Sequence, residues 1–104
     1  MLPEEIDLHD SVIKSMCVDY ERCGVAIEVD SYLSDDSKHR EPISIKFNNV
    51  SSMSKICDFI ALQKNAKPGN VCYWNPSQFL GTTFIYLSDG CLAITAESID
   101  VSVC

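Results

Sequence analysis

Apolar and polar residues alternate one by one along much of the chain. The alternation is clearest in residues 12–20, 25–29 and 43–47. Successive side chains of a strand point to opposite faces, so each run predicts a strand with one buried and one wet face. A short turn at 21–24 predicts an antiparallel hairpin between the first two strands, and the polar segment 34–42 predicts a long connection to the third.

The hydrophobic period changes between residues 51 and 65. Apolar side chains there recur at i, i+3, i+4 and i+7, at Met53, Ile56, Cys57 and Ile60. This spacing is typical of an amphipathic helix, and a serine before it can cap the helix N-terminus. We therefore predict one short helix at about 51–65, lying over the open face of the sheet.

Strand patterns return in the last third of the chain, at 71–74, 82–87 and 91–103. The Asp89-Gly90 step between the last two runs predicts a hairpin turn. Within the final run, apolar residues occupy even positions up to Ala96 and odd positions from Ile99 onward. A β-bulge or bend near Glu97-Ser98 would bring both sets to the same face.

These patterns predict a mainly β fold, of the α+β type because of the helix. We expect an antiparallel sandwich or half-barrel of about six strands. A length of 104 residues fits a single domain, residues 1–104, around one hydrophobic core.

The N-terminus and the cysteines favour a cytoplasmic protein. The first residues, MLPEEID, lack the basic and apolar regions of a secretory signal, and no apolar run reaches the ~18 residues of a membrane span. In a cytoplasmic protein the thiols stay reduced. We expect most of them to act as small core hydrophobes; they are Cys17, Cys23, Cys57, Cys72, Cys91 and Cys104.

Charge is acidic and unevenly distributed. The formal net charge is −7, with −8 in residues 1–36, +4 in residues 37–67 and −3 in residues 68–104. Such a chain repels nucleic acid and anionic lipid, whereas a basic protein partner is attracted to it. The plainer interpretation is that acidity only keeps the protein dispersed in solution.

Residues with catalytic potential do not form a recognisable motif. His9-Asp10-Ser11 has the composition of a hydrolase triad, yet adjacent residues cannot converge as nucleophile, base and orienting group. We expect a turn or the start of a strand, with His9 holding the N-terminal arm by a buried hydrogen bond. A hydrolase would require His9 or His39 to meet a nucleophile in space.

Ligands for metals and phosphates are also sparse. The chain has two histidines and no C-x-x-C spacing, so only a site from His9, Cys17 and Cys23 is conceivable. The four glycines are scattered singly and form no phosphate-binding loop. We expect no cofactor and no metal.

Three segments of the sequence resemble a known group of proteins. They are LHDSVI at 8–13, G-N-V-x-Y-W at 69–74 and FIYLSDGCLAITAESIDV at 84–101. Together they are similar to short β-rich bacterial families that resemble the immunity proteins of contact-dependent inhibition and related polymorphic toxin systems. The resemblance covers both ends of the chain and little of the middle, and its motifs specify fold rather than catalysis.

The resemblance implies a non-enzymatic cytoplasmic protein that binds one toxin domain and occludes its active site. A basic nuclease is one candidate toxin class, because an acidic protein can occupy a nucleic-acid cleft. Loops held by a rigid sheet usually carry binding, so the candidate contacts are Asp30, Tyr32, Asp35, Asp36 and Trp74.

Alternatives remain open. Of the pair Tyr73-Trp74, one or both rings can anchor a partner, or one can fill the core while the other covers an edge. A stand-alone ligand-binding or adaptor domain would use the face of the sheet for a small molecule, and a large apolar pocket would favour it. An exposed edge strand could also pair with a second copy to form a homodimer.

Overall fold

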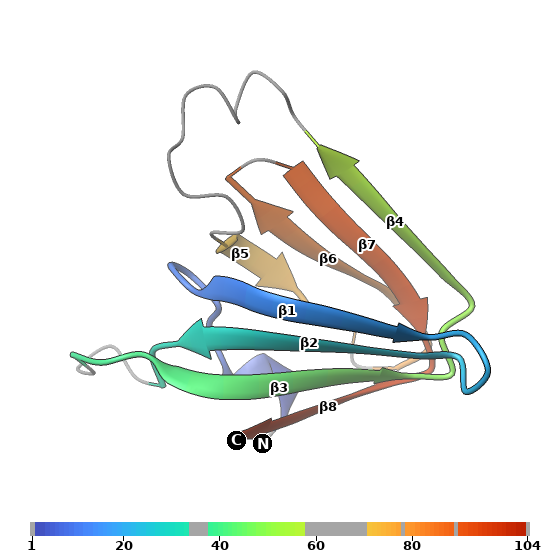
Figure 1. Cartoon of the computed structure of the whole chain (residues 1–104), viewed down its shortest axis with the longest axis horizontal. Coiled ribbons are helices and arrows are strands. Elements are labelled where there is room, and N and C mark those ends of the chain that lie inside the picture. The colour runs from blue at the N-terminus through green and yellow to red at the C-terminus, as the bar shows by residue number, and fades with distance from the viewer. Residues whose placement is uncertain (1, 34–37, 58–70, 78, 89, 104) are drawn as a thin grey trace.

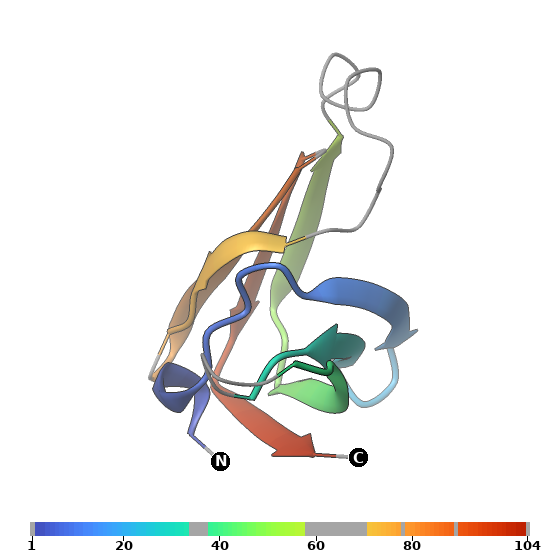
Figure 2. The ribbon, with the colours of Figure 1, turned by 90° about the vertical axis from the view of Figure 1, so that its left-hand side faces the viewer.

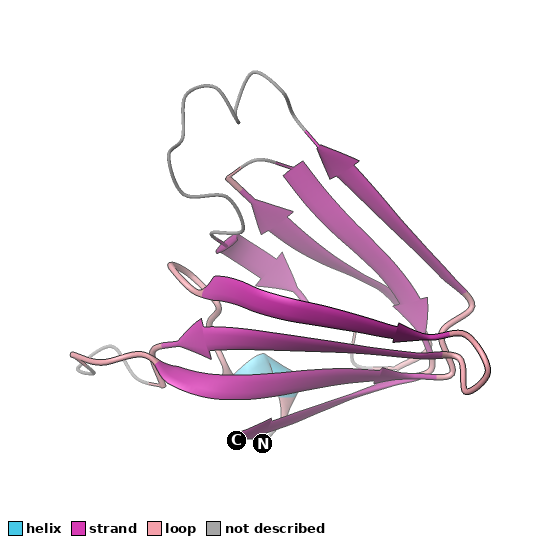
Figure 3. Ribbon diagram, viewed as in Figure 1, coloured by secondary structure: helices cyan, strands magenta, loops and turns pink. Residues whose placement is uncertain are grey.

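The computed structural model describes residues 2–33, 38–57, 71–77, 79–88 and 90–103. These residues form one 3-10 turn and eight strands (Figure 3). In chain order they are η1 (Pro3–Glu5), β1 (Val12–Asp19), β2 (Gly24–Ser31), β3 (Glu41–Asn48), β4 (Ser52–Cys57), β5 (Val71–Asn75), β6 (Gly81–Leu87), β7 (Gly90–Ala96) and β8 (Ser98–Val103).

The strands make two four-stranded sheets, ordered β1-β2-β3-β8 and β4-β7-β6-β5. Every neighbouring pair is antiparallel. The two sheets come together at one end and diverge toward the other, and they do not close into a barrel (Figure 1). The prediction of a mainly β antiparallel fold is confirmed, with eight strands in place of about six.

A corner joins the two sheets where β3 passes into β4 and β7 into β8. Asn48 pairs with Ser98, and Ser52 pairs with Thr95. The three residues 49–51 on one side of the corner therefore lie opposite the two residues 96–97 on the other. Asn49 adopts a positive φ of 53° there, and its Nδ2 donates to Oε2 of Glu97 at 2.8 Å. The bend predicted near Glu97-Ser98 is therefore confirmed, and it is the step by which strands change sheets.

The helix predicted at 51–65 is wrong over its first part. Ser52–Cys57 is strand β4, paired along its length with β7, while residues 58–65 lie outside the described residues. Met53 pairs with the buried Ile94, and Ser54 pairs with Ala93 on the opposite face, which is a period of two. A short apolar run can fit both the helical period of about 3.6 residues and the strand period of two, and here the pairing with β7 makes the segment a strand.

The core lies between the facing sides of the two sheets. Its largest fully buried side chains come from both sheets, and they include Phe47, Ile45, Ile85, Leu92 and Ile94. Along β2, β3 and β7 the buried residues follow the predicted alternation.

Strand β1 departs from the alternation at both of its ends. A register shift between Ile13 and Ser15 places Ile13, opposite Val29, on the core side in place of Val12. Tyr20, expected on the same apolar face as Val18, lies beyond the strand in a turn and is exposed.

An N-terminal arm, residues 2–11, runs between the two sheets beside β5 (Figure 2). Leu8 is fully buried, and Asp10 and Ser11 exchange backbone hydrogen bonds with Val71 at the outer edge of β5. The arm is tied to the other sheet by a buried hydrogen bond of 2.7 Å from the Ser11 hydroxyl to the Ser31 hydroxyl. His9 is exposed, so the expectation that His9 supplies a buried bond is wrong and Ser11 supplies it instead.

The cysteines differ from expectation where their side chains are described. Cys17 points outward from β1 and is exposed, Cys23 is exposed in the β1–β2 turn, and Cys91 is half-buried. All three are free thiols. Within the described ranges, no helix combines the length and hydrophobicity that a membrane crossing requires.

Candidate partner-binding surface

The predicted contacts Asp30 and Tyr32 lie at the far end of β2, away from the corner. Each has a basic neighbour: Nζ of Lys14 is 3.5 Å from Oδ2 of Asp30, and the Arg40 guanidinium lies over the Tyr32 ring at 4.9 Å. Nε of Arg40 also donates to the backbone oxygen of Asp10 at 3.1 Å. This end of the sheet is therefore close to neutral in its described part, and Tyr32 is half-buried under a cation.

The other predicted contacts are divided between the core and the part of the chain that the structure leaves out. Asp35 and Asp36 lie outside the described residues. Trp74 is buried, with 8% of its surface exposed, and its Nε1 donates to the backbone oxygen of Ile6 at 3.1 Å. The Trp74 ring fills the core and holds the N-terminal arm, so it is not presented at the surface as an anchor.

Sequence reasoning missed the most exposed large hydrophobic residue among the described residues, Tyr20, which is 88% exposed. It begins the turn between β1 and β2, which covers residues 20–23. The Asp19 carboxylate accepts the backbone N–H of Arg22 at 3.2 Å, and Nε of Arg22 lies 3.9 Å from the same carboxylate. The turn is joined to the corner because the N–H of Val50 donates to the Cys23 backbone oxygen at 2.7 Å.

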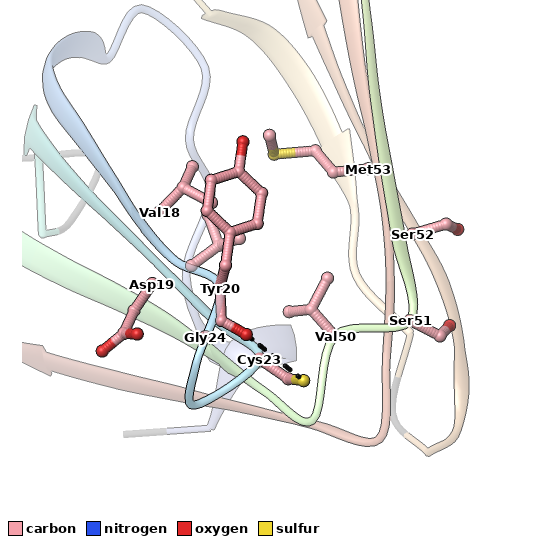
Figure 4. Close-up of a pocket in the computed structure, with 10 residues that line it drawn as sticks. Val18, Asp19, Tyr20, Cys23, Gly24, Val50, Ser51, Ser52 and Met53 are labelled. Carbon is pink, nitrogen blue, oxygen red and sulfur yellow. Dashed lines mark hydrogen bonds between the residues drawn. The ribbon is translucent and has the colours of Figure 1, made fainter.

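A hollow of about 240 Å³ lies next to this turn, between the end of β1 and the start of β4 (Figure 4). Val18, Val50 and Met53 form its apolar lining, and Tyr20 stands beside Met53 at its rim. We call the surface made by residues 18–23, Val50 and Met53 the turn–corner surface. It combines an exposed ring, an apolar recess and a backbone fixed by two sheets, which are the parts of a binding surface.

Carboxylates surround the turn–corner surface. The exposed acids at this end of the molecule are Asp19 and Glu21 in the turn, Glu97 at the corner and Asp100 on β8, against the bases Arg22 and Lys46. Asn48 and Asn49 bind Asp100 and Glu97 through their side-chain amides at 2.9 and 2.8 Å, which fixes both carboxylates in place. The field here is negative and preorganised.

The sequence did carry a signal for Tyr20. It lies between Asp19 and Glu21, directly before the predicted turn at 21–24. An aromatic residue between two acids at a turn is expected to be exposed. The alternating pattern instead predicted Tyr20 as the last inward residue of the strand.

The arrangement of reactive side chains gives no catalytic geometry at His9. Ser11 is fully buried and donates to Ser31, whereas the His9 imidazole is exposed, with Nε2 3.5 Å from Oδ2 of Asp10. Across the ranges that the structure covers, no three His, Cys, Asp or Glu side chains gather as they would around a metal ion. His9, Cys17 and Cys23 therefore do not form a ligand set.

Comparison with known proteins gives no relative. No family model matches the chain, and neither a curated protein nor a solved structure matches it.

Proposed function

We propose that this chain is a non-enzymatic binding protein that acts as the immunity protein of a bacterial toxin system. It binds the cognate toxin domain through the turn–corner surface and blocks that domain's active site. The proposal rests on the resemblance of the three sequence segments and on the chemistry of this surface.

The observation that carries the proposal is Tyr20. A Tyr that is 88% exposed leaves most of its surface open to a partner. Tyr is one of the residues that dominate interface energetics, because it buries a large rigid ring and still satisfies its hydroxyl. The apolar recess beside Tyr20 offers a complementary place for a partner's apolar side chain.

The charges around Tyr20 indicate which partner fits. With Asp19 and Glu21 on either side of Tyr20 and Glu97 nearby, a basic surface is steered toward the turn. Nuclease toxins bind an anionic substrate, so their clefts offer such a basic surface. The turn–corner surface, with Tyr20 between Asp19 and Glu21, would occupy that cleft in place of nucleic acid.

The shape of the recess favours a protein partner over a small molecule. Pockets for drug-sized ligands usually enclose about 300–1,000 Å³ and cover most of the ligand. The hollow beside Tyr20 measures about 240 Å³. It is the right size for one or two side chains of a partner.

Co-expression tests the proposal. The domain at the C-terminus of the protein encoded immediately upstream would be produced in bacteria with and without this chain. We expect that domain to stop growth alone, and we expect this chain to restore growth and to co-purify with it as a stable complex. A domain that is not toxic, or that stays toxic and does not bind this chain, would overturn the proposal.

A further inference from the structure

The outer face of the sheet β4-β7-β6-β5 is the second notable surface of the molecule. Strand pairing shows which residues belong to this face. Residues that pair with buried Ile85, Leu92 or Ile94 point inward to the core, and the residues that alternate with them along each strand point outward. The outward side chains include Ser54, Tyr73, Thr82, Phe84, Tyr86 and Thr95.

Three aromatic rings form a row across this face, which we call the aromatic row. Tyr73 and Tyr86 are stacked with ring centroids 4.5 Å apart, and Phe84 and Tyr86 are stacked with centroids 6.2 Å apart. Tyr73 is 55% exposed and Phe84 is 37% exposed. The three rings together offer an aromatic surface on which the rings of a protein partner can pack.

The face carries no charge among its described side chains, although the protein as a whole has a net charge of −7. In the sequence, residues 68–88 contain no Asp, Glu, Lys, Arg or His. The loop between β5 and β6 adds Phe79 and Leu80, exposed by 79% and 71%. Exposed apolar side chains concentrated on one hairpin mark an interaction surface.

Charge indicates the occupant. A basic partner gains nothing from an uncharged face and is drawn to the acidic turn–corner surface instead. A second copy of this acidic chain is repelled at the acidic turn–corner surface, whereas at the uncharged outer face it meets no like charge. The aromatic and hydroxyl side chains of one copy can also pack against the same side chains of a second copy, related by a two-fold axis, as in homodimer interfaces.

Three of the four edge strands, β5, β1 and β4, are poorer places for a second copy. The N-terminal arm covers β5 at Val71 by two backbone hydrogen bonds. Strand β1 is interrupted by a bulge at Lys14, and Lys55 of β4 pairs with Leu92, on the core side of its strand. Bulges and inward-pointing charges are devices that keep edge strands from pairing.

We propose that two copies of this chain pack through the outer faces of this sheet, with the aromatic row at the centre of a two-fold interface. Four strands at ~4.8 Å spacing and five residues at ~3.3 Å give a flat area of roughly 320 Å² per copy. Two copies would together bury roughly 640 Å², which is less than the ~1,200 Å² at the low end of stable interfaces, so we expect a weak and transient dimer. Met53 of the turn–corner surface pairs with buried Ile94 and therefore lies on the inner face of this sheet, so a dimer through the outer face leaves the turn–corner surface open.

Analytical ultracentrifugation of the full chain between about 1 and 200 µM tests this dimer. We expect a concentration-dependent shift from monomer to dimer in the wild type. Tyr73→Glu places a like charge at the centre of the interface and should raise the dissociation constant at least about tenfold. Tyr20→Glu, the same change at a more exposed tyrosine outside the interface, should leave the dissociation constant of the dimer unchanged.

Phe84→Lys is the second variant, and circular dichroism establishes that each variant is folded. If Tyr73→Glu unfolds the chain, the result with Phe84→Lys decides. A wild type that stays monomeric over the whole concentration range would overturn the proposal. A dimer that persists in the folded variants would also overturn it, because the contact would then lie elsewhere.

Discussion

Neighbouring aromatic residues have opposite roles in this protein, and the difference arises from backbone details that alternation does not record. Tyr73 stands outward in the aromatic row, while Trp74 lies in the core. A register shift between Val71 and Tyr73 places both Val71 and Trp74 inward. The expectation that one ring of the pair fills the core is therefore confirmed, but the sequence could not assign the rings, because a bulge of one residue has no local signature here.

The ionisation of Tyr86 gives a test at the same scale. Partial burial raises the pKa of the Tyr86 hydroxyl above its usual value, and Tyr73 and Cys91 beside it raise that pKa further. Because the pKa is higher in the folded chain than in the unfolded chain, this contribution to stability is fully present below about pH 10 and is lost as pH rises through the folded value. Tyr86→Phe removes the ionisable hydroxyl.

Urea unfolding measured from about pH 9 to pH 11.5 checks this prediction. The free energy of unfolding should fall more steeply with rising pH in the wild type than in Tyr86→Phe. Parallel pH profiles for the two proteins would show that Tyr86 is not preferentially protonated in the folded state.

The elements show where sequence reasoning succeeds and where it stops. Strands β2, β3 and β7 and the bend after Ala96 follow from alternation and from its change of phase. Strand β4 does not, because its pairing partner β7 lies far along the chain, and a spacing that also fits a helix cannot reveal that partner. An N-terminal arm held by His9 was expected, but the contacts that hold the arm were not predicted, since they depend on Trp74 and Val71.

The corner is the element whose geometry can be tested most directly. Asn49 has φ 53°, a conformation that glycine adopts freely and that costs a β-branched residue about 1–2 kcal/mol. Both Asn49→Gly and Asn49→Val lose the bond to Glu97, so the difference between them isolates the backbone. We expect Asn49→Val to be less stable than Asn49→Gly by about 1–2 kcal/mol.

The matched control is Asn75, which is exposed on strand β5. There the order should reverse, with valine more stable than glycine, because extended backbone favours β-branched side chains. Chemical denaturation of the four variants gives the comparison. The same order at both positions would contradict the account of the corner.

At the scale of the whole molecule, the two proposed surfaces are separated by charge and by position. The turn–corner surface lies where the sheets meet and is surrounded by Asp19, Glu21 and Glu97. The aromatic row lies on the outer face of one sheet, among uncharged side chains. In our two proposals, acidic charge attracts a basic partner to the turn–corner surface, and the absence of charge on the outer face permits a second copy to pack there.

The affinity of the upstream-encoded toxin domain for two alanine variants tests the central claim most directly. Isothermal titration calorimetry would compare Tyr20→Ala with Tyr73→Ala, which changes the same residue type at an exposed position outside the turn–corner surface. We predict that Tyr20→Ala weakens binding at least about tenfold and that Tyr73→Ala changes it by less than about twofold. Equal affinities for the two variants, or a loss only with Tyr73→Ala, would contradict the claim that the turn–corner surface binds the toxin.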